Sequence, residues 1–319
     1  MSVSKSIVII GSINMDLVCR APRFPANGET ILGSEFQMIP GGKGANQSVA
    51  AAKLAGKEMT VHHIGRVGAD DLGLRLLHGL QSHDVETKYV TITEGVSSGV
   101  AMILVEKSGE NRIVVAPGAN AKLSPADLDR AESLIRQAAC VVMQLEIPLE
   151  TVRHAIAMCR RHKVFTILDP APAPEKAPRE LFSVDLLTPN QGEAKQLLGV
   201  PGRAKVKRKP IVDPKQIAAD LHARGAKRVA LKLGPRGAMS LGEQGRIERH
   251  SGFRVTAIDT TAAGDAFTAA LAVGHVAGMS LSEMVRFANA AGAMCCTKFG
   301  AQPALPSRAD VDRLIAGAG

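Results

Sequence analysis

The feature that most constrains the fold is an alternation of short apolar runs with helical patterns along most of the 319-residue chain. Each run is continuously apolar, which is typical of strands buried on both faces of a parallel sheet. The candidate strands are residues 7–10, 61–64, 140–144, 164–168, 185–187 and 229–233. The candidate helices are residues 46–55, 71–81, 125–137, 149–162 and 214–223, and the C-terminal third from residue 265 is mainly helical. This order predicts an α/β fold of three layers, with helices on both faces of a mainly parallel central sheet.

Two stretches depart from this pattern. Residues 99–105 and 111–116 flank a polar turn, which predicts a β-hairpin. Residues 17–38 are extended and rich in turn-forming Pro and Gly. Together they predict a small β-sheet flap, formed by about residues 16–40 and 97–117, that projects from a single domain spanning residues 1–319. A flap of this kind commonly closes over a ligand and excludes water.

Polar side chains and glycines gather where the predicted strands end. Any one of them is more often an ordinary loop residue than a ligand contact. Open parallel sheets bind ligands at the carboxyl ends of their strands, so five strand ends with the same pattern favour a shared cleft. The residues are Asn14 and Asp16, Gln144 and Glu146, Asp169, Asn190 and Glu193, and Gly234 and Gly237.

The formal net charge of +9 raises the question of nucleic-acid binding. Much of this charge comes from one short segment with Arg203, Lys205, Lys207, Arg208 and Lys209, and removing these five charges leaves +4. The segment lacks aromatic residues and is flanked by Pro and Gly, which indicates a solvated loop. We therefore expect small-molecule ligands and no nucleic-acid partner.

Composition also bears on location. No apolar run approaches the roughly 18 residues of a membrane span. The five cysteines show no Cys-x-x-Cys spacing, which argues against a zinc site or a disulfide framework and favours reduced thiols in the cytoplasm.

Residues 259–265 combine small side chains with a carboxylate where an apolar helix begins. The first N–H groups of a helix have no intrahelical acceptor and form an anion site with the helix dipole. Ala262, Ala263 and Gly264 would let a phosphate approach these groups. Asp265 would accept a proton from an attacking hydroxyl, and we expect the helix dipole to keep it ionised at neutral pH. The alternative is that Asp265 only caps the helix.

Two other segments carry possible ligand groups. Residues 41–46 are Gly-rich but match neither a Walker A loop nor a dinucleotide fingerprint. Their glycines would let backbone approach a ligand, with Lys43 and Asn46 as hydrogen-bonding groups, although a flexible strand-to-helix turn explains them equally well. Asn190 and Glu193 are spaced as a capping box. The alternative is that this pair holds waters around Mg²⁺.

Taken in order, these motifs resemble those of the ribokinase-like (PfkB) family of carbohydrate kinases, from residues 11–16 to residues 300–303. Residues 41–46 and 259–265 resemble the family's two signatures, and residues 118–120, 143–146 and 169–173 match between them. The resemblance implies a ribokinase-like fold and ATP-dependent transfer of a phosphoryl group to the 5-hydroxyl of D-ribose. Two alternatives stay open: a kinase of the same family that acts on 2-deoxyribose or another sugar or nucleoside, and a catalytically silent protein that binds sugar or nucleotide.

The resemblance also implies roles for particular residues. Sugar contacts correspond to Asn14, Asp16, Gly42, Lys43, Asn46 and Glu146, the catalytic base to Asp265, and the anion hole to Ala262, Ala263 and Gly264. The nucleotide site corresponds to Asn190, Glu193, Lys232, Leu233, Gly234, Pro235, Arg236, Gly237, Gly264 and Asn289. A K⁺ site corresponds to Asp259, Thr261, Cys295, Lys298, Gly300 and Ala304, where Ala304 lacks the hydroxyl that is common at this position. ATP, Mg²⁺ and K⁺ are the implied cofactors, and a homodimer through the β-flap is the implied assembly.

Overall fold

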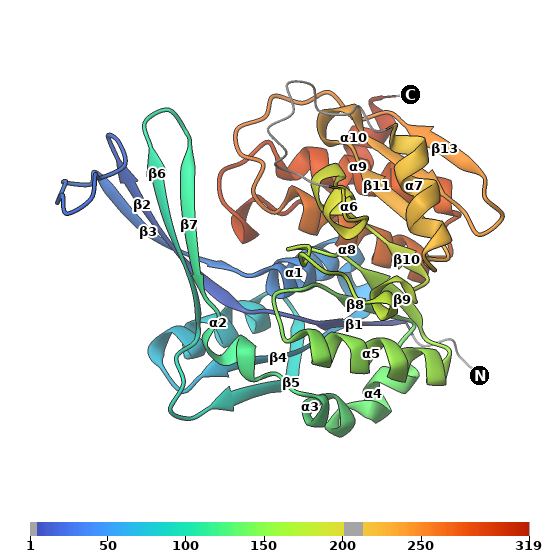
Figure 1. The fold of residues 1–319 in the computed structure, drawn as a ribbon, viewed down its shortest axis with the longest axis horizontal. Coiled ribbons are helices and arrows are strands. Elements are labelled where there is room, and N and C mark those ends of the chain that lie inside the picture. The colour runs from blue at the N-terminus through green and yellow to red at the C-terminus, as the bar shows by residue number, and fades with distance from the viewer. Residues whose placement is uncertain (1–4, 201–212, 319) are drawn as a thin grey trace.

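The centre of the fold is a nine-stranded sheet within the residues that this computed structural model describes, 5–200 and 213–318 (Figure 1). The strand order is β13-β12-β11-β10-β9-β8-β1-β4-β5. Neighbours from β5 to β11 run parallel, whereas β12 and β13 add antiparallel pairs at one edge. The strands are β1 (Ser6–Ile10), β4 (Thr60–Gly68), β5 (Val85–Thr93), β8 (Cys140–Met143), β9 (Phe165–Leu168), β10 (Leu186–Leu187), β11 (Val229–Lys232), β12 (Ala238–Leu241) and β13 (Ile247–His250).

Helices cover both faces of this sheet. One face carries α1 (Lys43–Ala55), α2 (Asp71–Ser82), α8 (Ala263–Val276), α9 (Leu281–Cys295) and α10 (Arg308–Ala316). The other carries α3 (Pro125–Arg130), α4 (Glu132–Gln137), α5 (Leu149–His162), α6 (Gln191–Leu197) and α7 (Pro214–Ala223). Short 3₁₀ helices lie in the connections: η1 (Gly56–Glu58), η2 (Gly118–Lys122), η3 (Arg179–Phe182), η4 (Gly234–Arg236) and η5 (Gln302–Ala304).

Strand β1 shows why the continuously apolar runs require two helix layers. Successive side chains of a strand point to opposite faces of the sheet. Ile7 and Ile9 accordingly join the core under α1 and α8, and Val8 and Ile10 join the core under α5. All four side chains are fully buried. The three-layer fold with a mainly parallel sheet is therefore confirmed.

Each of the six predicted strands and five predicted helices has a counterpart among the described residues, with two kinds of difference. The predicted helix 125–137 is divided at Ala131, where the backbone turns out of helical geometry (φ −99°, ψ 6°) between α3 and α4. Strands β5, β12 and β13 are not predicted. β5 and β13 lie at the edges of the sheet and are only partly buried, so they lack a continuous apolar run. The polar Ser240 interrupts the run in β12.

The predicted flap is a separate sheet of four strands in the described chain, with the order β3-β2-β6-β7. Its strands are β2 (Asn14–Ala21), β3 (Glu35–Gly41), β6 (Gly99–Glu106) and β7 (Asn111–Ala116). It projects beside the main sheet, with the β6–β7 hairpin at its free end (Figure 1). At its base the Asn120 amide binds both the N–H and the carbonyl of Ile13, at 2.9 and 3.0 Å, which joins β2 to η2.

The position of β1 determines where a ligand site can form. β1 pairs with β4 on one side and with β8 on the other, so the two halves of the sheet diverge from it. Ligands of open α/β sheets bind where the strand order reverses, beyond the carboxyl ends of the strands. Here the N-terminus of α1 reaches this point, because a Cβ on Gly44 would lie only 2.6 Å from the carbonyl carbon of Gly11. Only glycine allows this approach.

Two expectations concern the rest of the chain. The basic cluster at residues 203–209 lies outside the described residues, so the structure does not bear on its role. In the described ranges, no helix is both long and apolar enough to cross a bilayer.

Candidate active site

The predicted anion site is the half-buried start of α8. Ala262 precedes the helix with a left-handed backbone (φ 60°, ψ 3°), and no side chain caps the first turn. The N–H groups of Gly264 and Asp265 are therefore without an intrahelical acceptor, as at any helix start. The small side chains of Ala262, Ala263 and Gly264 leave these groups accessible to an anion.

Asp265 is the third residue of α8 and does not cap it. Its carboxylate instead accepts hydrogen bonds from α1: Asn46 Nδ2 lies 3.0 Å from Oδ2, and Gln47 Nε2 lies 3.0 Å from Oδ1. The alternative role as a helix cap is thus wrong. A carboxylate held from the side by a second helix is positioned for chemistry at the helix start.

Asp265 is expected to be ionised at neutral pH, and its pKa agrees with this even though burial raises it. Burial raises the pKa of this carboxyl to about 6; the charge of Asp169 also raises it, while Lys43, Asn46 and Gln47 lower it. A carboxyl with this pKa is mostly ionised at pH 7. It is also a stronger base than an exposed aspartate, and general bases are more effective when their pKa approaches the working pH.

The predicted sugar contacts lie around the same point. Asn120 Nδ2 donates to Asn14 Oδ1 at 2.7 Å, which leaves the Asn14 amide nitrogen free to face a ligand. Glu146 Oε2 accepts from Ser12 Oγ at 2.6 Å and from the backbone N–H of Lys43 at 3.0 Å. Glu146 thus joins three segments that are distant in sequence: the connection between β1 and β2, the start of α1 and the loop after β8.

Two glycines make the sugar side compact. Gly42 has a positive φ of 85°, which favours glycine, and a Cβ there would lie 2.7 Å from the Asn14 backbone nitrogen. A Cβ on Gly41 would lie 2.4 Å from the Asp16 carboxylate. The Gly-rich segment is therefore a closely packed strand-to-helix turn between β3 and α1.

Charge is concentrated in this cluster. Burial, together with the negative charges of Glu146 and Asp265, raises the pKa of Asp16 to about 7, although the charge of Lys43 lowers it. Burial disfavours the charged form of Lys43, but Asp265, Glu146 and Asp169 outweigh this and raise its pKa above the usual range. Lys43 is thus the shared cation of a group of carboxylates, which brings Asp16, Lys43, Glu146 and Asp265 into one site.

A pocket of about 660 Å³ opens on the other side of Gly264. Six of the residues predicted to bind nucleotide line it, namely Lys232, Gly234, Pro235, Gly237, Gly264 and Asn289. Apolar residues that the sequence did not single out complete the wall, among them Phe253, Val255 and Phe267. Ligand pockets are typically apolar with a few polar groups, and this one has the size and character to hold an adenine nucleotide.

Four predicted nucleotide residues lie elsewhere. The Leu233 side chain is buried in the core, and Arg236 donates to Gln191 Oε1 at 2.6 Å. Asn190 and Glu193 form the capping box of α6, with reciprocal hydrogen bonds of 2.9 and 2.8 Å. The capping interpretation is confirmed, and it uses the single side-chain oxygen of Asn190 and one of the two oxygens of Glu193.

The predicted K⁺ residues are only partly connected. Asp259 Oδ1 accepts from the backbone N–H and hydroxyl of Thr261 at 2.9 and 2.7 Å, and Oδ2 accepts from the Gly300 N–H at 2.9 Å. Cys295 Sγ donates to the Thr261 carbonyl at 3.4 Å. Ala304 is buried and Lys298 is exposed. The structure therefore folds Asp259, Thr261, Cys295 and Gly300 into one loop cluster behind the anion site.

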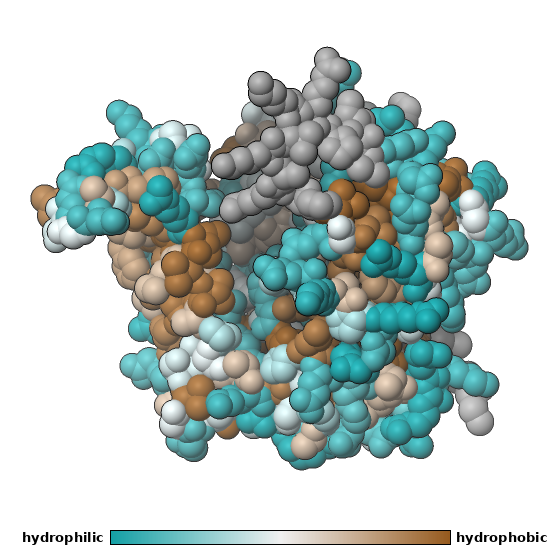
Figure 2. All heavy atoms as spheres, viewed as in Figure 1, coloured by the Kyte–Doolittle hydropathy of each residue, from teal (hydrophilic) through white to brown (hydrophobic). Residues whose placement is uncertain are grey.

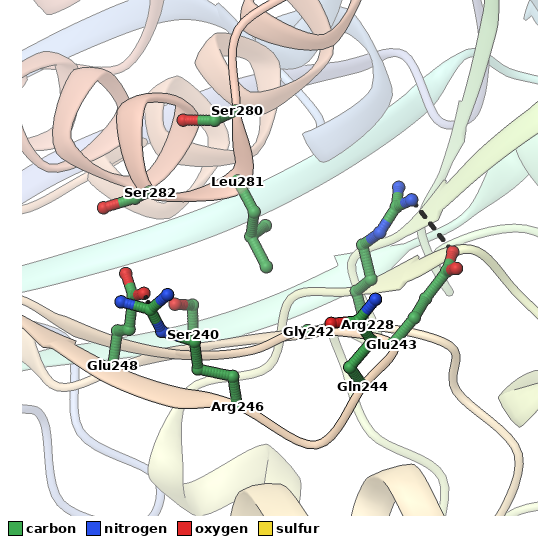
Figure 3. Close-up of a pocket in the computed structure, with 10 residues that line it drawn as sticks. All are labelled: Arg228, Ser240, Gly242, Glu243, Gln244, Arg246, Glu248, Ser280, Leu281 and Ser282. Atoms are coloured by element: carbon green, nitrogen blue, oxygen red, sulfur yellow. Dashed lines mark ion pairs between the residues drawn. The ribbon is translucent and has the colours of Figure 1, made fainter.

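A further surface hollow lies away from this site, between β11–β13 and the start of α9 (Figure 3). Its charged residues pair with one another: Arg228 with Glu243 at 2.9 Å and Arg246 with Glu248 at 2.7 Å. Its Ser240 is bonded to His250 at 2.8 Å. The charged groups of the hollow are thus paired with one another, and none of them belongs to the cluster around Asp265.

The sequence of the protein matches the pfkB family of carbohydrate kinases over residues 4–308. The chain belongs to this family. A ribokinase of Haemophilus influenzae is 37% identical over 307 residues, covering 95% of this chain and 96% of the relative. A deoxyribokinase of Salmonella typhi is 34% identical over 306 residues, covering 94% and 95%.

Solved structures agree with this assignment. The Arabidopsis thaliana ribokinase complexed with ribose and ATP has a TM-score of 0.87 and 32% identity, covering 98% of this chain and 99% of that one. The ribokinase of Thermotoga maritima has a TM-score of 0.86 and 32% identity, covering 97% and 99%. The predicted family and the ribokinase-like fold are confirmed.

Sequence reasoning missed one group of this pfkB-family site. Gln47 lies between Asp265 and Asp169 and is fully buried. The available signal was a polar side chain next to Asn46 in a helix of otherwise small and apolar residues. Its partner could not be found, because Asp265 is 218 residues away in the chain.

Proposed function

We propose that this protein transfers the γ-phosphoryl group of ATP to the 5-hydroxyl of D-ribose. The observation that carries the proposal is the position of Asp265, between the polar cluster of Asn14, Asp16 and Glu146 and the pocket that begins at Gly264. The ribokinase relatives, and the similar structure that contains ribose and ATP, support the same two substrates.

On the acceptor side, Asn14, Asp16 and Glu146 would hold the sugar hydroxyls, together with Lys43 and the backbone of Gly42. Asn46 has a buried Oδ1 without a partner, while its Nδ2 donates to Asp265. A buried acceptor of this kind is costly unless a ligand supplies a donor, so a sugar hydroxyl fits it. The acceptor hydroxyl would then lie beside the Asp265 carboxylate.

In the reaction, the oxygen of the 5-hydroxyl forms a bond to the γ-phosphorus while Asp265 accepts the proton of that hydroxyl. The bond between that phosphorus and the β,γ-bridging oxygen breaks, and ADP leaves. The N–H groups at the start of α8 face the negative charge on the transferring group. Because phosphoryl transfer proceeds through a loose transition state, positioning and charge stabilisation provide most of the rate enhancement.

Cations complete the donor side. Lys232 Nζ lies 2.8 Å from Asp169 Oδ1 and 3.4 Å from the Cβ position of Gly264, so it stands next to the anion site. Glu193 retains its Oε1 outside the capping box, and the Asn190 Oδ1 can accept a second hydrogen bond. Both oxygens suit the water shell of Mg²⁺. When bound, Mg²⁺ would neutralise charge on the ATP phosphates.

We expect ADP release to be fastest with D-ribose when the protein is assayed with Mg-ATP and a panel of sugars. Ribose should be preferred to 2-deoxyribose, because polar groups left unpaired in the pocket penalise the missing hydroxyl. The deoxyribokinase relative makes 2-deoxyribose the second candidate. Faster turnover of 2-deoxyribose would replace the substrate assignment, and binding without ADP release would support the silent protein instead.

We also propose that K⁺ binds behind the anion site. The Asp259 carboxylate already joins Thr261 to Gly300, which brings backbone carbonyls of this loop together as oxygen ligands require. Cys295, Lys298 and Ala304 would add backbone oxygens. A bound ion would order the loop that presents the first N–H groups of α8 to the phosphate.

The flap supports a proposed homodimer. By strand register, Met38, Met102 and Val114 lie on one face of the flap with Leu17, and they are 37%, 53% and 61% exposed. Asp16 faces the other way, toward the sugar site. Figure 2 shows apolar side chains gathered along the flap. Exposed apolar patches of this kind mark interaction sites.

Replacing both Met102 and Val114 by Lys should convert the dimer to a monomer, as measured by sedimentation equilibrium. A wild-type protein that is monomeric at micromolar concentration would contradict the proposed assembly.

A cytoplasmic location is the remaining proposal. The five cysteines, all within the described residues, are free, as reduced thiols would be.

A further inference from the structure

One side chain of α1 contacts two buried carboxylates at once. Gln47 Nε2 lies 3.0 Å from Asp265 Oδ1 and 3.0 Å from Asp169 Oδ2. A side-chain amide carries two N–H donors on this nitrogen, so it can donate to both carboxylates simultaneously. Gln47 itself is fully buried, and Asp169 and Asp265 are 2% and 5% exposed. Water is therefore largely excluded from this bridge.

The orientation of the Gln47 amide is fixed by a second amide. Gln144 Nε2 donates to Gln47 Oε1 at 2.7 Å. A flip of Gln47 would turn its oxygen toward the two carboxylates and lose this bond. Gln144 is in turn confined by close packing, since a Cβ on Gly11 would lie 2.0 Å from Gln144 Oε1. The bridge is thus held in the one orientation in which it donates to both acids.

The bridge also connects the two halves of the site. Asp169 accepts from Gln47 through Oδ2 and from Lys232 through Oδ1, the latter at 2.8 Å. Lys232 lines the pocket on the far side of Gly264. A continuous series of hydrogen bonds therefore runs from Asp265 through Gln47 and Asp169 to Lys232.

We propose that Gln47 is a positioning residue for phosphoryl transfer, which holds Asp265 and Asp169 apart and aims the Asp265 carboxylate at the acceptor hydroxyl. This inference rests on the proposed kinase function. Two carboxylates buried side by side tend to share a proton, which would leave one of them unable to act as a base. An amide that donates to both satisfies them without a shared proton.

Several titratable groups surround Asp265, and Gln47 acts among them. They are Lys43 on α1, Asp16 on β2, Asp169 after β9 and Cys295 on α9. Of these, Asp169 raises the pKa of Asp265 and Lys43 lowers it, while the bonds from Asn46 and Gln47 also lower it. Removing the Gln47 donor should therefore raise the Asp265 pKa above its value of about 6.

The test uses Gln47→Met, which has a similar shape but cannot donate. The acid limb of kcat/KM should move upward by about one pH unit, so activity lost at pH 7 returns toward the wild-type level at pH 9. Gln144→Met should move the limb in the same direction by less, because it removes only the lock on the amide. Ser48→Ala is the matched control: Ser48 is also buried in α1, but it bonds to His63, at 2.7 Å. It should leave the acid limb in place.

A carbon-13 NMR titration of the aspartate carboxyls, with the Asp265 signal identified by its loss in Asp265→Asn, measures the same pKa without turnover. A raised Asp265 pKa in Gln47→Met supports the positioning role even if the protein phosphorylates no sugar, which would count against the kinase function alone. Lower activity in Gln47→Met with an unchanged Asp265 pKa overturns the inference. If Gln47→Met does not fold, Gln144→Met decides by the same criterion.

Discussion

Asp265→Asn should lower kcat by at least about 10²-fold, the lower end of what a positioned general base contributes. The substitution removes the group that accepts the hydroxyl proton while the start of α8 and its N–H groups remain. The KM for ribose should change little, because Asn14, Asp16 and Glu146 are untouched. Steady-state kinetics with saturating Mg-ATP measure both constants. Near-normal turnover would show that Asp265 has no role as a base.

The same variant makes a prediction about stability that separates lost chemistry from lost folding. The pKa of Asp265 is about 6 in the folded protein, against 3.8 for an ordinary aspartate. Because the folded-state pKa is raised, folding is favoured below pH 4, and this advantage is lost as pH rises through 6. The ionisation cost removed in Asp265→Asn is of the order of 3 kcal/mol at pH 8.

At pH 8 the unfolding temperature of Asp265→Asn should therefore be at least as high as that of the wild type. At pH 4 it should be equal to that of the wild type or lower. Asn46 can help, since its unpaired Oδ1 could accept from the new amide if its side chain flips. The control is Thr268→Val, one turn further along α8. Its hydroxyl bonds to Thr188 at 3.1 Å and does not contact Asp265, so turnover should be retained.

The fold could be predicted where a strand buried on both faces is also apolar throughout, unlike β12, in which the buried Ser240 interrupts the run. β1, β8 and β11 each present a continuous apolar run, because helices cover both sides of the central sheet. β5 could not be predicted in this way, since it lies at the edge and its side chains are only partly buried. A continuous apolar run therefore indicates that a strand is buried, and it does not measure strand propensity.

Some residues of the candidate site could be predicted from the sequence and others could not. Asp265, Lys43 and Asn46 could be predicted because they occupy motifs that are local in the sequence. The role of Gln47 could not, because its partner Asp265 is more than one hundred residues away. Residues 118–120 were matched, but the contact of Asn120 with the distant Asn14 could not be predicted. The pKa of Asp265 also could not be predicted from the sequence. The dipole of its own helix is a local feature, whereas burial beneath α1 and the charge of Asp169 come from the tertiary fold.

The second large effect concerns the cluster behind the anion site. Three hydrogen bonds to the Asp259 carboxylate join residues 259–261 to Gly300. Lys53 lies on the other side of this region, where its ammonium donates to the carbonyls of Gln302 and Leu305 at 3.2 and 3.1 Å. A fixed positive charge nearby, together with the missing hydroxyl at Ala304, weakens a cation site without removing its backbone carbonyls.

Replacing K⁺ by N-methylglucamine should therefore lower activity, and Asp259→Ala should abolish the difference between the two salts. Ala304→Ser should lower the K⁺ concentration for half-maximal activation, because it adds an oxygen where the loop has a methyl group. Asp312→Ala, which removes an exposed carboxylate paired with Arg308 on α10, should leave the K⁺ response unchanged. Equal wild-type activity in the two salts at constant ionic strength would refute the K⁺ site. If K⁺ orders the first turn of α8, as proposed, removing K⁺ should lower kcat more than it raises the KM for ribose. The reason is that the N–H groups of that turn face the transferring phosphoryl group and not the sugar.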